Sequence, residues 1–96
     1  MSPTNKKKLN LIRVKLDKLD TELLKLIKKR SNLVNEVLKV KNHKNEIIDQ
    51  KRINFILKKI KKKSNQLKID PKITNRIWKN MIWSFIDYEK KNFKKK

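Results

Sequence analysis

The chain has 96 residues, with 29 lysines and arginines against nine acidic residues and a formal net charge of +20. This length limits it to one domain, and the absence of cysteine excludes disulfides, thiolate metal sites and a cysteine nucleophile. No apolar run reaches the ~20 residues of a membrane span, and no apolar segment follows the basic N-terminus as in a secretory signal. We therefore expect a cytoplasmic protein without a membrane partner, and a single histidine leaves no basis for a metal cluster.

The cations are unevenly divided between the two basic residue types. Twenty-five are lysine and only four are arginine, and lysine, asparagine and isoleucine together make up half of the chain. Arginine presents a planar fork of donors that lysine lacks, so the few arginines are candidates for binding sites. They are Arg13, Arg30, Arg52 and Arg76.

A long first helix is predicted from about Asn5 to about Asn42. Apolar residues recur every three or four positions from Leu9 to Val40, and Arg30 is the one polar residue in the series. A helix of that length would span ~57 Å, which two shorter helices cannot cover. A second copy of the chain is the simplest partner, so we expect a homodimer.

Two shorter helices are predicted after it, giving an all-α fold with three helices in each chain. A break at residues 43–46 leads to Asp49, a good N-cap for a second helix from about Gln50 to about Gln66. Asp70 followed by Pro71 is a strong start signal for a third helix, which extends toward Phe93. Residues 1–96 are thus expected to form a single domain, with residues 1–6 and 94–96 as frayed tails.

Several polar residues interrupt or flank the apolar faces of these helices. Lys41 lies eleven residues after Arg30, near the same helix face, and Arg13 lies seventeen residues before Arg30. Arg52 lies one turn after the second N-cap, and Glu89 follows the apolar face of the third helix. A pocket built from these residues would be cationic and would suit a small dianion, because arginine binds a carboxylate through two parallel hydrogen bonds.

Three segments resemble the all-helical chorismate mutase family. They are LNLIRVKLDKLD with LLKLIKKR up to Arg30, IIDQKR up to Arg52, and KIDPKITNRIWKNMIWSFIDYE up to Glu89. The resemblance covers about residues 9–90, and the ordered set of Arg13, Arg30, Lys41, Asp49 and Arg52 carries most of its specificity. It implies an intertwined helical homodimer that uses no cofactor.

The resemblance also implies a reaction, the rearrangement of chorismate to prephenate in the shikimate pathway to phenylalanine and tyrosine. This intramolecular [3,3] rearrangement needs only orientation of a dianion and stabilisation of charge on the breaking ether oxygen. By resemblance, Arg30, Arg52 and the other chain's Arg13 would bind the carboxylates, and Asp49 would contact the ring hydroxyl. Lys41 and Glu89 would donate to the ether oxygen, Glu89 in its protonated form, and Phe85 would line the pocket.

This sequence departs from the usual family pattern at three positions in or beside this set of residues. Ile53 stands where many mutases have glutamate, Phe85 where they often have serine, and Glu89 where they have glutamine. The segment from Lys41 to Arg52 is also one residue shorter than in the commonest bacterial form. Ile53, Phe85 and the shorter segment resemble the isochorismate-pyruvate lyase branch, which forms salicylate, whereas Asp49 resembles the mutases.

Two functions from other classes compete with this interpretation. A lysine-rich helical protein could bind nucleic acid, but the lysines are spread over all faces and no aromatic residues interleave with them. We therefore expect no specific nucleic-acid partner. A purely structural coiled-coil adaptor would have the long apolar seam but would not bind small dianions saturably.

Overall fold

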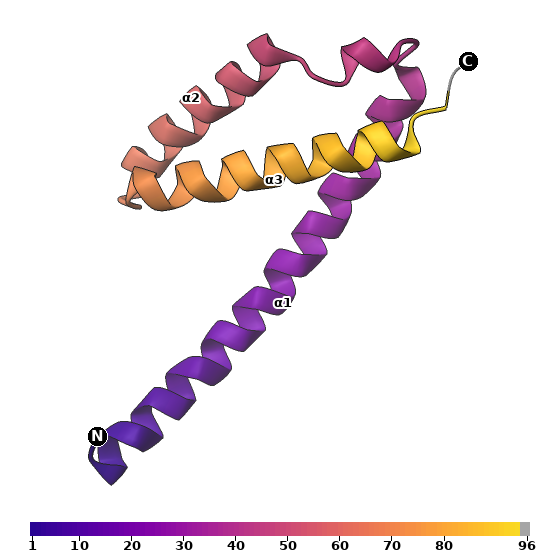
Figure 1. The fold of residues 1–96 in the computed structure, drawn as a ribbon. Helices are drawn as coiled ribbons and strands as arrows, with labels where there is room; N and C mark the ends of the chain where they lie inside the picture. The colour runs from indigo at the N-terminus through magenta and orange to yellow at the C-terminus, as the bar shows by residue number, and fades with distance from the viewer. Residues whose placement is uncertain (95–96) are drawn as a thin grey trace. The chain divides into compact units, whose positions relative to one another are not determined.

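The computed structural model describes residues 1–94 and consists of helices joined by short connections (Figure 1). Three α-helices, α1 (Pro3–Val40), α2 (Gln50–Gln66) and α3 (Pro71–Asn92), are joined by connections that include a short 3-10 helix, η1 (Lys44–Glu46). No strand occurs within the described residues. The predicted all-α fold with three helices is therefore confirmed, while residues 95–96 of the expected C-terminal tail lie outside the described part.

The starts of α2 and α3 follow from local capping chemistry. The side chain of Asp49 accepts a hydrogen bond from the backbone N–H of Arg52 at 3.0 Å. The side chain of Asp70 likewise accepts from the backbone N–H of Lys72 at 3.0 Å, with Pro71 at the first helical position. Both carboxylates satisfy helix N–H groups that have no partner within the helix, and both predicted helix starts are confirmed.

Helix α1 begins and ends two residues earlier than the sequence pattern predicted. Its start at Pro3 uses the same type of signal as α3, since the Ser2 hydroxyl accepts from the backbone N–H of Asn5 at 3.1 Å. At the other end the backbone N–H of Lys41 still donates to the carbonyl of Val37 at 3.2 Å. Lys41 therefore lies just beyond the helix, in the connection that leads to η1.

The chain divides into two compact units, of which the first comprises residues 1–33. This unit is the greater part of α1, and none of its residues is buried. Its seam leucines are largely exposed, with Leu19 at 61% and Leu26 at 59% of full exposure. An apolar stripe of this length normally packs against another helix.

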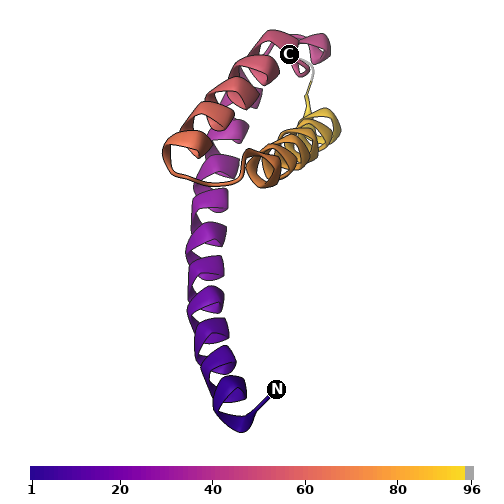
Figure 2. The same cartoon turned by 90° about the vertical axis from the view of Figure 1, so that its left-hand side faces the viewer.

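The second unit begins at Val34 and contains the last turns of α1 together with α2 and α3. Helices α2 and α3 form an antiparallel pair joined by a short turn, as Figures 1 and 2 show. Four isoleucines form the core of this unit, with Leu38, Ile56, Leu57, Trp78 and Phe93 packed around them. These buried residues are Ile47, Ile53, Ile82 and Ile86.

The turn between α2 and α3 is held by a buried pair of hydroxyls. The Ser64 and Thr74 oxygens lie 2.7 Å apart, and the Ser64 hydroxyl also lies 2.6 Å from the carbonyl of Ile60. Lys68 in the turn has a φ of 57°, in the left-handed region where glycine is usual, and this chain contains no glycine. Through the contact between Ser64 and Thr74, the end of α2 is joined to the first turn of α3.

Candidate functional site

Two of the predicted site residues form an ion pair across the second unit. Lys41 Nζ lies 3.4 Å from Glu89 Oε1, although the two residues are 48 positions apart. Only 18% of the Lys41 side chain and 8% of the Glu89 side chain are exposed. An ammonium and a carboxylate are thus held together at the edge of the core, where screening by water is reduced.

Lys41 and Asp49 also line the same surface hollow. Its volume is about 410 Å³, and its other lining residues are Glu46, Ile48, Gln50 and Lys51. The connection between α1 and α2 forms most of its wall, and Glu46 is fixed there by accepting a hydrogen bond from the backbone N–H of His43 at 2.9 Å. This hollow is large enough for a small organic ligand, and it brings Lys41 to the same surface as Asp49.

Arg52 is placed next to this hollow by the capping of α2. Its backbone N–H is bound by Asp49, so the two candidate residues share one turn of the helix start. Its side chain is exposed and lies over the ring of Phe55, with 5.3 Å from the guanidinium carbon to the ring centroid. Within residues 1–94 the recorded ion pairs do not involve Arg52.

Two of the three positions that depart from the family pattern, Ile53 and Phe85, have different environments. Ile53 is only 6% exposed and packs in the core with Ile82 and Ile86, so it presents no polar group where many mutases carry glutamate. Phe85 is partly buried on α3, one turn before Glu89 and on the same helix face. This face of α3 therefore carries an aromatic ring followed one turn later by a carboxylate.

Arg13 and Arg30 both lie on α1 within residues 1–33. Arg13 is exposed and Arg30 is partly buried. Seventeen residues of helix separate their Cα atoms by ~25 Å along the axis, so they cannot bind the same small molecule within one chain. The structure thus pairs Lys41 with Glu89, places Lys41 and Asp49 on one hollow, and keeps Arg13 apart from Arg30.

Two further contacts near the site were not predicted from the sequence. The Tyr88 hydroxyl donates to Asn35 Oδ1 at 2.9 Å, which connects α3 to the last turns of α1 beside Glu89. No sequence signal identifies a pair 53 residues apart. The Arg52–Phe55 contact, in contrast, follows the i, i+3 spacing of helix neighbours and could have been noticed.

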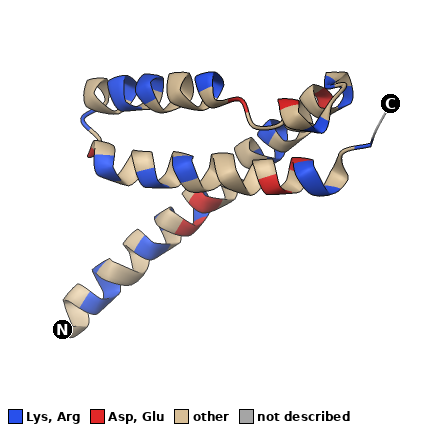
Figure 3. Cartoon of the chain, turned by 45° about the horizontal axis from the view of Figure 1, so that its top comes forward, with Lys and Arg blue, Asp and Glu red and all other residues tan. Residues whose placement is uncertain are grey.

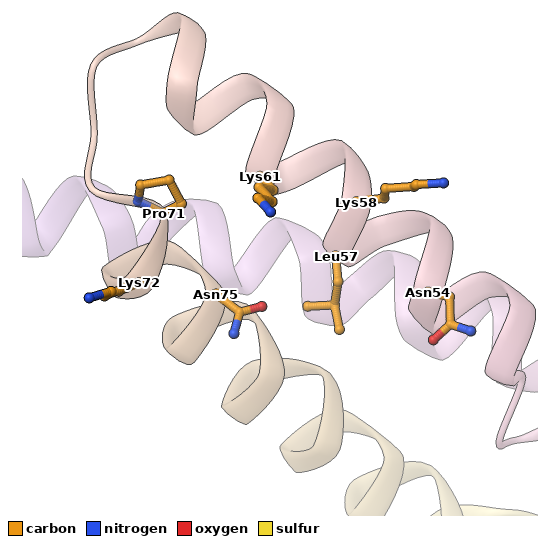
Figure 4. Close-up of a pocket in the computed structure, with 7 residues that line it drawn as sticks. All are labelled: Asn54, Leu57, Lys58, Lys61, Pro71, Lys72 and Asn75. Atoms are coloured by element: carbon orange, nitrogen blue, oxygen red, sulfur yellow. The ribbon is translucent and has the colours of Figure 1, made fainter.

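A second groove between α2 and α3 does not share any of the candidate residues. Its volume is about 560 Å³, and it is lined by Asn54, Leu57, Lys58, Lys61, Pro71, Lys72 and Asn75 (Figure 4). Figure 4 shows the side chains of Lys58 and Lys72 extending away from Leu57 rather than converging on it. Three lysines around a groove are ordinary in a chain that is about a quarter lysine, and we assign no function to this groove.

Comparison with known proteins identifies the family of this chain. The family model for chorismate mutase type II matches residues 12–90, which include Arg13, Arg30, Lys41, Asp49, Arg52, Phe85 and Glu89. The chain belongs to the chorismate mutase type II family. Searches of curated proteins and of solved structures gave no match.

Membership of the chorismate mutase type II family makes the chain an isomerase that converts chorismate to prephenate. The all-helical architecture agrees with it. Figure 3 shows lysines and arginines along all three helices rather than gathered on one of them, as expected for a generally basic surface. No helix within residues 1–94 combines the length and apolarity needed to cross a bilayer.

Proposed function

We propose that this chain acts as a homodimeric chorismate mutase in the biosynthesis of phenylalanine and tyrosine. The observation that carries this proposal is the Lys41–Glu89 pair, partly buried and 3.4 Å apart, with Lys41 also lining a hollow with Asp49. A dianionic substrate in that hollow would meet the ammonium of Lys41 and the carboxyl group of Asp49, and Arg52 follows the lining residue Lys51 along the chain.

Each candidate residue has a role that follows from its chemistry. Arg30, Arg52 and Arg13 of the second chain bind the two carboxylates and hold chorismate in its compact diaxial shape. Lys41 donates to the ether oxygen, where negative charge develops as the carbon–oxygen bond breaks. One carboxylate oxygen of Asp49 accepts a hydrogen bond from the backbone N–H of Arg52, and the other accepts one from the ring hydroxyl of the substrate. Phe85 forms the apolar wall of the pocket.

The second chain is part of this proposal because α1 has an uncovered apolar stripe. Residues 1–33 contain no buried position, and full burial of each seam leucine would contribute ~1.5–3 kcal/mol. A second α1 packed along this stripe would bury the leucines and bring a second Arg13 toward the first chain's pocket.

An isochorismate-pyruvate lyase activity of the same fold is the second candidate. The burial of Ile53 in the core favours it, because the pocket then lacks the glutamate that many mutases have after the second-helix arginine. The same cationic residues would bind isochorismate, which also carries two carboxylates.

One assay separates the two activities. Purified protein is incubated with chorismate or with isochorismate, and the products are measured as prephenate or as salicylate with pyruvate. We expect prephenate from chorismate, and a fall of about 10²-fold or more in kcat for Lys41→Ala because a donor to the developing charge is lost. Arg76→Ala is the matched control, since Arg76 is an exposed arginine of α3 outside the proposed pocket. Exclusive formation of salicylate and pyruvate would assign the chain to the lyases.

A further inference from the structure

The side chain of Phe55 lies on the outer face of α2 and contacts two cations. The guanidinium carbon of Arg52 is 5.3 Å from the ring centroid, and Lys59 Nζ is 5.8 Å from the same centroid. Both distances fall within the ~6 Å range of cation–π attraction. The ring itself is 54% exposed and is not part of the core cluster, so core packing does not account for its position.

The position of Arg52 in α2 is unfavourable for a cation, so a contact that stabilises its side chain needs a separate cause. It is the third residue of α2, where the unpaired N–H groups of the helix start carry partial positive charge. The bond from its backbone N–H to Asp49 fixes the main chain but leaves the long side chain without restraint. An arginine side chain loses rotamer entropy when it becomes fixed, so a free guanidinium would bind a carboxylate less tightly.

The aromatic face restrains the guanidinium without occupying its donors. The attraction between the cation and the ring does not require a hydrogen bond to an acceptor atom, so the N–H donors of the guanidinium stay available to both oxygens of a carboxylate. We infer that Phe55 is a positioning residue for Arg52 and restricts the conformations of its guanidinium, which binds a carboxylate of the substrate. This inference rests on the proposed function, in which Arg52 binds the substrate.

The kinetic test compares variants that keep or remove the ring. Phe55→Leu keeps an apolar, helix-compatible side chain, and we expect it to raise KM for chorismate about two- to fivefold, the effect of losing an exposed cation–π contact. We expect kcat to stay unchanged, because Arg52 binds the carboxylate equally in the ground state and the transition state. Phe55→Tyr retains the ring and should retain KM, and Lys59→Gln should also leave KM unchanged as the control for the second cation.

A double-mutant cycle tells whether the ring acts through Arg52. In the Arg52→Ala background, Phe55→Leu should raise KM no further, since the contact is already lost. An equal rise in that background, or an unchanged KM in the Phe55→Leu single variant, would overturn the inference. An unchanged KM for Arg52→Ala alone would instead remove Arg52 from the proposed site.

A measurement independent of activity tests the contact itself. Ring currents of Phe55 should shift the side-chain proton resonances of Arg52 upfield in the NMR spectrum of the unmodified protein. The shift should disappear in Phe55→Leu and persist in Phe55→Tyr. Its absence from the unmodified protein would overturn the inference even if the enzyme is active, whereas failure of the proposed function would appear as an absence of turnover with the shift intact.

Discussion

Glu89 is the residue whose protonation state should control the proposed reaction. A glutamine at this position would donate a hydrogen bond at any pH, but a carboxylate only accepts, so Glu89 must carry a proton to donate to the ether oxygen. In the structure Glu89 is buried and paired with Lys41 at 3.4 Å, a contact for which the substrate carboxylates would compete. A carboxyl group that has lost its proton cannot donate this hydrogen bond.

We therefore predict that kcat of the unmodified enzyme falls as the pH increases, because a carboxyl group donates a hydrogen bond only while it carries its proton. Glu89→Gln should remove this dependence and maintain activity at higher pH. Rate–pH profiles of the two proteins check the prediction, with Asp87→Asn on the exposed side of α3 as the matched control. Identical profiles for the unmodified protein and Glu89→Gln would mean that Glu89 does not donate to the substrate.

One buried polar contact joins helices α2 and α3 at their junction. Ser64 is 3% exposed and Thr74 8%, and their hydroxyl oxygens are 2.7 Å apart. Each hydroxyl also lies within hydrogen-bond distance of a backbone carbonyl of its own helix, Ile60 or Pro71. The loss of one partner therefore leaves the other with a local acceptor.

Thr74→Val keeps the shape of the side chain and should lower the free energy of unfolding by about 1 kcal/mol, the net value of one hydrogen bond. The double variant Ser64→Ala, Thr74→Val should cost less than the sum of the two single variants, because the second substitution removes a contact already broken. Urea unfolding followed by circular dichroism, at one fixed protein concentration, measures these differences. Strict additivity would show that the two hydroxyls are not coupled.

At the scale of the whole molecule, the uncovered stripe on α1 predicts an obligate dimer. The exposed leucines of residues 1–33 would be unfavourable in water without a partner, so we expect dimers without a stable folded monomer. Sedimentation and circular dichroism over a dilution series should show helicity falling together with dissociation. A fully helical monomer at low concentration would contradict this prediction.

Mixing two inactive variants tests whether each pocket uses both chains. Arg13→Ala and Arg30→Ala homodimers should each be inactive or nearly so, because each lacks one arginine in both pockets. In a heterodimer formed from the two, one pocket would lack both arginines and the other would be complete, so part of the activity should return. If refolded mixtures stay as inactive as the separate variants, Arg13 does not act across the interface.

Local sequence signals determine where the helices of this protein begin and which family it belongs to. The N-caps Asp49 and Asp70 act within three residues of themselves, so the starts of α2 and α3 could be predicted directly. Ser2 before Pro3 gives the same kind of signal, whereas apolar periodicity alone predicts a start of α1 two residues too late. Membership of the family was likewise predictable, because the spacing of a few cationic residues within helices carries it.

Only the tertiary structure decided which residues of different helices and connections come into contact. Lys41 contacts Glu89 across 48 positions, and Tyr88 contacts Asn35 across 53, because helix docking and a bent connection bring them together. The apolar face of α2 that the sequence predicts includes Ile53, but only helix docking decides that its neighbours in the core are Ile82 and Ile86. Helix periodicity specifies which face of each helix is apolar, but the depth and rotation at which two faces pack depend on side chains from both helices at once.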